Sequence, residues 1–332
     1  MRITRTLALF LTIIICVISS IPNGFTLETP SMIVYNKGAV NQESQLEAMI
    51  NDNDWAQWAV KTSSLSSDDL KDMTHLVLYN ARHDQLYTEE ELDDIEEWFN
   101  VGGKTIWVSS DSDFFSNNGR ITSANQILET IDSQLRAESA SVRDPVNNAD
   151  PEYRVLASPN TEDAEIASIV EGVETVLVSG PSPIVAYIGG EYLALEDDAH
   201  ENIHVILTSR ATAEMVDNTE PRAETHTRTS GVYCVMAMEL IPVKRNIVIV
   251  SGESPFSQGE GIYRPEVIYR TKYTVTYPQQ GAALVANLLH YTVAKEWAAT
   301  PSETQNSIPV HAVAVLIGLM AAAHVKRLYK SH

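Results

Sequence analysis

The sequence contains little cysteine and little positive charge. Its 332 residues include two cysteines, Cys16 and Cys234, so the framework of several disulfides that holds small secreted domains together is excluded. The 23 lysines and arginines are outnumbered by 44 aspartates and glutamates, which gives a formal net charge of −21. This balance argues against a nucleic-acid partner, because binding to phosphate backbones requires dense positive charge.

Glycine and proline are also scarce, at 15 and 14 residues, and we find no internal repeat of fixed period. Their scarcity excludes collagen-like and low-complexity chains. Hydrophobic residues make up 44% of the chain and charged residues 20%, a composition that is typical of globular proteins with a buried core. We therefore expect an ordered domain between the two ends of the chain.

Both ends of the chain carry apolar runs that predict a single-pass type I protein of the cell membrane. In residues 1–26 two arginines precede the uncharged run LALFLTIIICVI, as in a secretory signal peptide. The alternative is an uncleaved anchor, although this run is short for a span of roughly 20 residues. Residues 308–325 form an apolar stop-transfer pattern before the basic tail 326–332, which we expect to be cytoplasmic. Between them we expect an extracytoplasmic domain at 27–297 and a polar linker at 298–307.

The extracytoplasmic part is strongly acidic. All 44 acidic residues, against 18 of the 23 basic ones, lie between the two ends, so this part carries a formal charge of −26. A solvated acidic surface resists aggregation and attracts cations. The expected partners are the membrane, through one C-terminal span, and a protein in the membrane or at the cell surface.

From residue 31 onward, short β-rich runs alternate with helical patterns. This order predicts an α/β fold, a flavodoxin-like three-layer sandwich with a largely parallel central sheet and additional β excursions. Central strands are expected at 32–35, 59–62, 75–79, 105–108 and 246–250, further β runs at 174–178, 184–188, 192–195, 203–208 and 233–240, and helices around Leu46 to Ile50 and at 122–135 and 279–297.

The clearest local pattern is the capping box Thr88-Glu89-Glu90-Glu91. Thr88 is the expected N-cap and Glu91 the N3 residue of a helix whose apolar stripe is Leu92, Ile95, Trp98 and Phe99. Gly102 and Gly103 are expected to end this helix before the next strand. The three patterns together predict a βαβ unit.

The stretch LVLYNARHDQLYTEEELDDIEEWFNVGGKTIWVSSDSDFF resembles the class I glutamine-amidotransferase-like superfamily, in its trehalose-utilisation, gliding-type ABC-transporter accessory and intraflagellar-transport-like relatives. The stretches NGRITSANQILETIDSQLRAESASVRDPVNNADPEY and NIVIVSGESPF extend the resemblance over residues 31–297, toward uncharacterised archaeal secreted domains. The resemblance implies an amidotransferase-like fold, but its motifs describe the fold rather than the chemistry.

Catalytic members of that superfamily carry a nucleophilic cysteine on a strand-to-helix elbow and a downstream His-x-Glu pair. The matching elbow here follows Val108 and reads Ser109-Ser110-Asp111-Ser112-Asp113, without cysteine. Cys234 lies inside a β run, where we expect a small core residue, and no His-x-Glu pair follows it. We therefore expect no amidotransferase activity and, more broadly, a protein that is not an enzyme.

The candidate site is the crevice at the carboxyl ends of the parallel strands, where open α/β sheets bind ligands. Polar side chains follow two of the expected strands, and two more residues follow a third. The candidate ligand-binding residues are Ser109, Ser110, Asp111, Asp113, Ser251, Glu253, Ser254, Arg82 and His83. No cofactor is expected, although the hydroxyls and carboxylates could hold a divalent cation or a polyhydroxylated ligand. The alternative is that these side chains only satisfy backbone groups at strand ends.

Two further segments are weaker candidates. Glu196, Asp197 and Asp198 with His200 could recruit Ca²⁺, but they lack the spacing of a calcium loop, and a solvated acidic loop is the simpler interpretation. Residues 256–277 are rich in tyrosine and arginine, which suits either a protein interface or an ordinary β excursion.

The leading hypothesis is a non-catalytic, membrane-anchored extracytoplasmic module for ligand binding or protein interaction, at an archaeal-type cell surface. One alternative is a cell-surface hydrolase acting on carbohydrate or ester, with Ser109, Ser110 or Ser254 as nucleophile and His83 or His290 as base. The sequence lacks a Gly-x-Ser-x-Gly elbow for such a serine. Another alternative is an accessory subunit of an ABC-type export system.

Overall fold

The computed structural model describes residues 29–39, 44–80, 82, 84–114, 118–197, 199–226, 230–256, 261–263 and 279–297. The expected signal peptide, linker, membrane span and cytoplasmic tail lie outside these residues, as does most of the segment 256–277. Within the described residues, no helix has the length and apolar character needed to cross a membrane.

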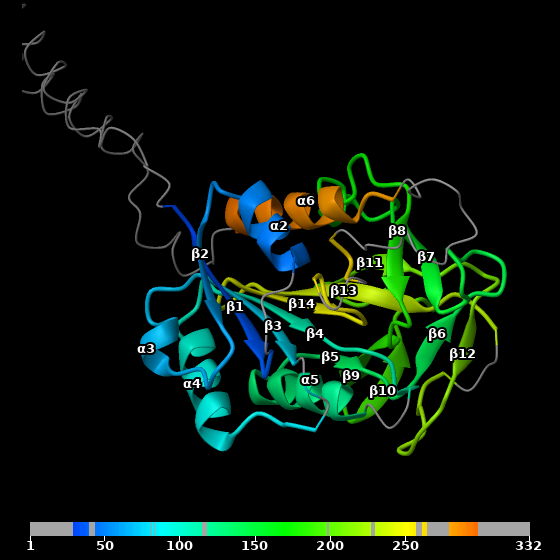
Figure 1. Cartoon of the computed structure of the whole chain (residues 1–332), viewed down its shortest axis with the longest axis horizontal. Helices are drawn as coiled ribbons and strands as arrows, with labels where there is room; N and C mark the ends of the chain where they lie inside the picture. Colours follow the sequence, from blue (N-terminus) through cyan, green and yellow to red (C-terminus); the bar gives the residue numbers. More distant parts are fainter. Residues whose placement is uncertain are drawn as a thin grey trace, which may run out of the picture.

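A nine-stranded sheet forms the centre of the molecule, in the order β2-β1-β3-β4-β14-β13-β11-β7-β8 (Figure 1). From β2 to β14 neighbouring strands are parallel, and from β14 to β8 they are antiparallel. The bounds are β1 Ser31–Lys37, β2 Gln57–Lys61, β3 His75–Asn80, β4 Thr105–Ser109, β7 Arg154–Pro159, β8 Val176–Ser179, β11 Ile203–Thr208, β13 Cys234–Ile241 and β14 Asn246–Ser251.

Helices cover both faces of the parallel part of the sheet. On one face lie α2 (Ser44–Asp52) and α6 (Gly281–Ala294), and on the other α3 (Ser67–Leu70), α4 (Glu89–Asn100) and α5 (Asn118–Thr130) (Figure 1). Strand residues alternate between the two cores, so that Val34 packs with the α2 and α6 side while Ile33 packs with the α4 and α5 side. The predicted three-layer α/β architecture is confirmed.

The capping box of α4 forms as predicted. The Thr88 hydroxyl accepts from the Glu91 amide at 3.3 Å, and the Glu91 carboxylate accepts from the Thr88 amide at 2.9 Å. Glu91 also accepts from Lys37 Nζ at 2.6 Å. Although burial raises the pKa of the Glu91 carboxyl, the bonds from Lys37 and Thr88 reverse this and hold it below its ordinary value. Glu91 therefore caps the first turn of α4 and links this helix to Lys37 at the end of β1.

Short additional strands flank the main sheet. The strands β5 (Leu135–Ala137), β9 (Ile184–Ile188) and β10 (Glu191–Ala194) form a three-stranded sheet, and β6 (Ser141–Arg143) pairs with β12 (Glu214–Val216). The prediction of β excursions is confirmed, although β5, β6, β7 and β12 were not predicted individually, nor were α3 and the 3₁₀ turn Ala164–Ile166.

The helix predicted at 122–135 was wrong at both ends. It begins at Asn118 and ends at Thr130, and Leu135 belongs to β5. Asp132 takes a left-handed conformation, with φ of 56°, and the Ser133 amide bonds back to the Leu128 carbonyl at 2.9 Å. This arrangement closes the last turn of the helix and directs the chain into the strand.

Candidate functional site

The two predicted polar clusters meet at the carboxyl ends of neighbouring parallel strands. Ser109 at the end of β4 lies level with Ser251 at the end of β14, and the Ser110 amide donates to the Ser251 carbonyl at 2.8 Å. We call residues 109–113 and 251–254 the crest. The prediction that these two strand ends are neighbours is confirmed.

Most crest hydroxyls bond to the protein itself. Ser251 Oγ accepts from Trp107 Nε1 at 2.9 Å and donates to the Glu253 carbonyl at 2.7 Å. Ser254 Oγ accepts from the Phe256 amide at 3.1 Å. These bonds hold the turn after β14, which is a common use of serine at strand ends.

Ser109 and Ser110 are the candidate nucleophiles at the elbow position. Ser109 Oγ is buried without a hydrogen-bond partner, and Ser110 Oγ makes a long bond of 3.5 Å to the Asp111 carbonyl. An attacking serine needs a base in hydrogen-bond reach. Among the described histidines none bonds to a crest serine, and His290 stacks on Trp55 with ring centroids 4.3 Å apart. His83 lies outside the described residues.

Asp111 forms a largely buried ion pair with Arg120, the third residue of α5. The Arg120 guanidinium also lies 5.6 Å from the centroid of the Tyr79 ring. Burial lowers the pKa of Arg120, but the surrounding Tyr79, Asp111 and Glu253 outweigh it and raise the pKa above its ordinary value. The charge of Asp111 is thus balanced by a base of the adjacent helix α5.

Asp113 is fully buried and anchors a distant segment. Its carboxylate accepts from Ser141 Oγ at 2.8 Å, from the Asn218 amide at 2.6 Å and from the Thr219 amide at 3.0 Å. Asn218 and Thr219 begin a segment, residues 217–226, that we call the strap. Within the described part of the chain, no group of three or more His, Cys, Asp or Glu side chains is arranged to hold a metal ion. The crest therefore offers no assembled cation site.

The part of the crest that follows β14 is covered by a loop of the β excursions. A Cβ atom on Gly252 would lie 2.1 Å from the Ser182 carbonyl oxygen, so only glycine fits at this position. The Ser182 amide donates to the Gly252 carbonyl at 3.1 Å, and the Pro181 carbonyl accepts from the Val142 amide at 2.8 Å. Backbone from residues 181–183 therefore rests directly on the end of β14.

Arg82 follows β3, the strand beside β4. Its guanidinium pairs with Asp84 at 2.8 Å, and this contact raises the pKa of Arg82. The stem of its side chain packs against Gly38 at the end of β1. Arg82 thus lies at the same edge of the sheet as predicted, on the neighbouring strand.

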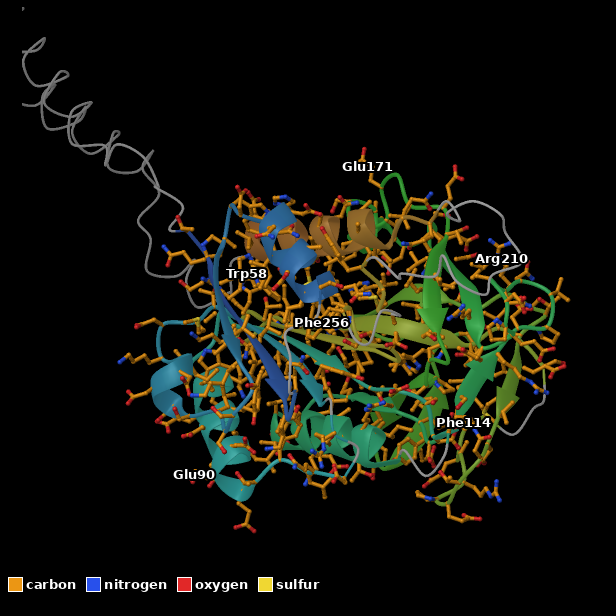
Figure 2. The ribbon with its side chains drawn as sticks, viewed as in Figure 1. Trp58, Glu90, Phe114, Glu171, Arg210 and Phe256 are labelled. Carbon is orange, nitrogen blue, oxygen red and sulfur yellow. The ribbon has the colours of Figure 1, made fainter. Side chains whose placement is uncertain are left out.

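Beside the crest opens a cleft of about 800 Å³. Its walls come from the crest, from β6 and β12, and from the turns before β7 and after β8. Phe114 and Tyr153 line it with exposed fractions of 51% and 44%. Figure 2 labels Phe114. The residues that line the cleft are Asp111, Ser112, Phe114, Arg120, Ser141, Val142, Arg143, Asp150, Pro151, Glu152, Tyr153, Ser179, Gly180, Val216 and Asn218.

Most of the charged side chains of the cleft already have ion-pair partners. Arg143 bonds to Glu214 at 2.8 Å and lies 3.8 Å from Glu152, while Arg120 is held by Asp111. Of the lining residues, the sequence analysis singled out Asp111 alone. Phe114 was detectable, because an aromatic side chain directly follows the polar run after β4. No local sequence pattern marks Tyr153, Arg143 or Asn218 as part of a site.

The acidic loop near Glu196 has a different role from the one predicted. Glu196 accepts from His226 Nε2 at 2.6 Å, and Glu138 bonds to the other ring nitrogen, so His226 is buried between two carboxylates. Burial lowers the pKa of His226, but the two carboxylates outweigh it and raise the pKa to about 9. Glu196 is therefore not part of a solvated loop, and Asp198 lies outside the described residues. Cys234 is fully buried in β13, the core position predicted for it.

No protein-family model matches this chain. No curated protein matches it either. Among solved structures it is similar to the mmIFT52 N-terminal domain, with 10% identity and a TM-score of 0.52 over 81% of this chain and all of that domain. The two share an overall fold. This likeness confirms, for the fold alone, the intraflagellar-transport part of the resemblance seen in the sequence.

Two glutamine-amidotransferase-type structures give lower scores. A putative GMP synthase subunit from Thermoplasma acidophilum is 13% identical, with a TM-score of 0.38 over 80% of this chain and 95% of that one. A glutamine amidotransferase from Thermotoga maritima is 10% identical, with a TM-score of 0.35 over 80% and 99%. Scores at this level do not support an argument about fold or activity, and the archaeal secreted branch stays a prediction.

Proposed function

We propose that this chain is a non-catalytic interaction module, anchored in the membrane with its α/β domain outside the cytoplasm, and that it binds a protein partner through the cleft beside the crest. The observation that carries the proposal is the contrast between the covered end of β14 and the cleft that opens beyond the end of β4, where Asp111 and Ser112 line it. The crest is the usual ligand position of an open α/β sheet. Here backbone from residues 181–183 covers the end of β14.

The chemistry of the crest supports a non-catalytic role. Asp111 is committed to Arg120, and Asp113 accepts four hydrogen bonds from Ser141, Asn218 and Thr219. Serine attack requires a general base and a place for the reacting carbonyl. Neither is assembled at the crest from the described residues.

The composition of the cleft supports protein binding. Phe114 and Tyr153 are large aromatic side chains that remain about half exposed at its edge, and Arg143 of β6 lines the same cleft. Tyrosine, phenylalanine and arginine are enriched at protein interfaces, where they act as anchors. Because both arginines of the cleft, Arg120 and Arg143, already have carboxylate partners, the gain on binding would come chiefly from burying the aromatic rings.

The membrane anchor rests on the two apolar ends of the sequence and the basic tail after residue 325. A chain of this topology meets partners in the membrane or at the cell surface. A membrane transport assembly of the ABC type is one candidate partner. Co-purification with its ATPase would support that candidate, and a stable monomer in detergent would count against it.

Site-specific photo-crosslinking in cells tests the proposal. A photoreactive phenylalanine analogue replaces Phe114 in the full-length chain, and as a control it replaces Val243, which is 88% exposed in the turn between β13 and β14. We expect a discrete crosslinked product from position 114, absent from position 243 and lost when Tyr153→Ala is added. Equal products from both positions would contradict the proposal.

A hydrolase assay addresses the enzyme alternative separately. Full-length protein is incubated with chromogenic esters and glycosides, and Ser109→Ala and Ser110→Ala variants are run beside it. We expect no turnover above background in any sample. Turnover that either variant abolishes would establish an active serine at the crest.

A further inference from the structure

A second cavity, of about 260 Å³, lies apart from the cleft. It is formed by α5, the turn after β5, Tyr192 of β10 and the strap, and it shares no lining residue with the cleft. We call it the side cavity. Its lining combines an aromatic ring, unpaired oxygen atoms and carboxylates, and the proposed function uses none of them.

Two oxygen atoms of the side-cavity residues have unmet hydrogen-bonding capacity. Gln126 Oε1 and Ser139 Oγ are both buried, and neither has a hydrogen-bond partner. Buried polar atoms in native proteins are nearly always bonded, because an unmet group keeps the cost of its lost hydration. A ligand that brings N–H donors would satisfy both atoms.

The charged side chains of the side cavity that lack a close ion-pair partner are carboxylates. Glu224 and Glu129 both line it, and Glu129 approaches a base only at 3.8 Å, in a contact with Arg136. Burial raises the pKa of the Tyr192 hydroxyl, and Glu224 and Glu129 raise it further against the opposing charge of Arg136, which agrees with a net negative potential at this ring.

The other charged residues of the lining are already paired. Arg222 donates to Glu220 at 2.9 Å and to Asp217 at 3.1 Å, so its positive charge is matched by two carboxylates. Glu138 is likewise bonded to His226. Arg222 and Glu138 therefore leave unchanged the negative charge that Glu224 and Glu129 give to the side cavity.

We propose that the side cavity binds a small organic amine. Its ammonium group would donate to Gln126 Oε1 and Ser139 Oγ, with its charge balanced by Glu224 and Glu129 and its alkyl part against the Tyr192 ring. A bare metal ion fits less well, because the described residues contain no group of three ligating side chains. An anion would be repelled by the uncommitted carboxylates.

Calorimetric titration of the full-length chain in detergent with putrescine tests the proposal. The neutral isostere 1,4-butanediol serves as the control ligand, and Glu90→Gln as the matched control variant. Glu90 is an exposed carboxylate on α4, away from the side cavity (Figure 2). We expect saturable binding of putrescine, none of butanediol, an affinity about tenfold lower in Glu224→Gln and an unchanged affinity in Glu90→Gln.

A second variant separates ligand binding from folding. Ser139→Ala removes a hydroxyl that has no partner, so we expect an unchanged Tm without amine together with weaker putrescine binding. Absence of saturable binding would overturn the proposal. So would equal weakening by Glu90→Gln, which indicates diffuse attraction to the acidic surface, or a Ser139→Ala variant that loses Tm but not affinity.

Discussion

The crest and the cavities beside it use polar side chains in opposite ways. At the crest the carboxylates of Asp111 and Asp113 are bonded to Arg120, Ser141 and the strap, and a loop rests on Gly252. Around the cleft the rings of Phe114 and Tyr153 stay about half exposed, and at the side cavity Gln126 Oε1 and Ser139 Oγ stay unbonded. At the crest, most polar groups other than Ser109 Oγ bond to the protein itself. The binding surfaces that we propose lie among the additional strands.

Gly252→Ala tests the closure of the crest and should have the largest effect. The added Cβ would meet the Ser182 backbone oxygen at 2.1 Å, and backbone cannot rotate away as a side chain can. We expect the free energy of unfolding to fall by about 4 kcal/mol, measured by urea denaturation. Gly231→Ala is the control, since its nearest neighbours would lie 3.9 Å away, and it should change little. Equal stability of the two variants would mean that the crest is open.

Asp113→Ala tests how the crest holds the strap. The variant leaves the donors of Ser141, Asn218 and Thr219 without their acceptor, so we expect a loss of about 3 kcal/mol. Hydrogen exchange should quicken first at the amides of Asn218 and Thr219. The exposed Asp54, changed to alanine, provides the control and should leave both readouts unaltered. Unchanged exchange in the strap of the Asp113 variant would refute its anchoring role.

The other end of the strap gives a prediction about pH. The pKa of His226 is raised to about 9 from an ordinary value of 6.5, so its protonated form is favoured by folding. The stabilisation that protonated His226 gives to the folded state is complete below pH 6.5, and it is lost as the pH rises to about 9. We expect the free energy of unfolding to fall by about 3 kcal/mol across this window, because each unit of pKa shift corresponds to about 1.4 kcal/mol. His226→Gln should remove the slope, and a variant that kept the slope would assign it to another group.

Ser109→Ala should have the smallest effect. Ser109 Oγ has no hydrogen-bond partner, so its removal should change the free energy of unfolding by less than about 0.5 kcal/mol, or raise it slightly. Ser251→Ala is the informative comparison, because that hydroxyl bonds to Trp107 and Glu253 and its loss should cost about 1 kcal/mol. If Ser109→Ala lowered the free energy of unfolding more than Ser251→Ala did, this would contradict the account in which Ser109 Oγ is unbonded and Ser251 Oγ is bonded.

Local patterns predicted the parallel half of the sheet well. Thr88 and Glu91 lie three residues apart, so their bonds can be inferred from the sequence, and they form as expected. The juxtaposition of Ser109 and Ser251 followed from two buried apolar strands and the rule that parallel strands end at one edge.

The cleft and the side cavity could not be predicted, because distant contacts create them. Asp113 meets Asn218 across 105 residues, and Glu138 meets His226 across 88. The strands involved are short: β5, β6 and β12 have three residues each, too few for an alternating pattern. The Gly252 contact likewise depends on where a remote loop, near Ser182, comes to rest.

The most direct test of the account compares two double variants in the cells that hold the full-length chain. Ser109→Ala with Ser110→Ala removes the two crest hydroxyls at the end of β4, and Phe114→Ser with Tyr153→Ser removes the exposed rings of the cleft. Native gel electrophoresis of solubilised membranes then reports whether each variant still enters a larger complex. Our account predicts that the crest variant keeps the complex and the cleft variant loses it. A complex that survives loss of both rings, but not loss of the two serines, would contradict it.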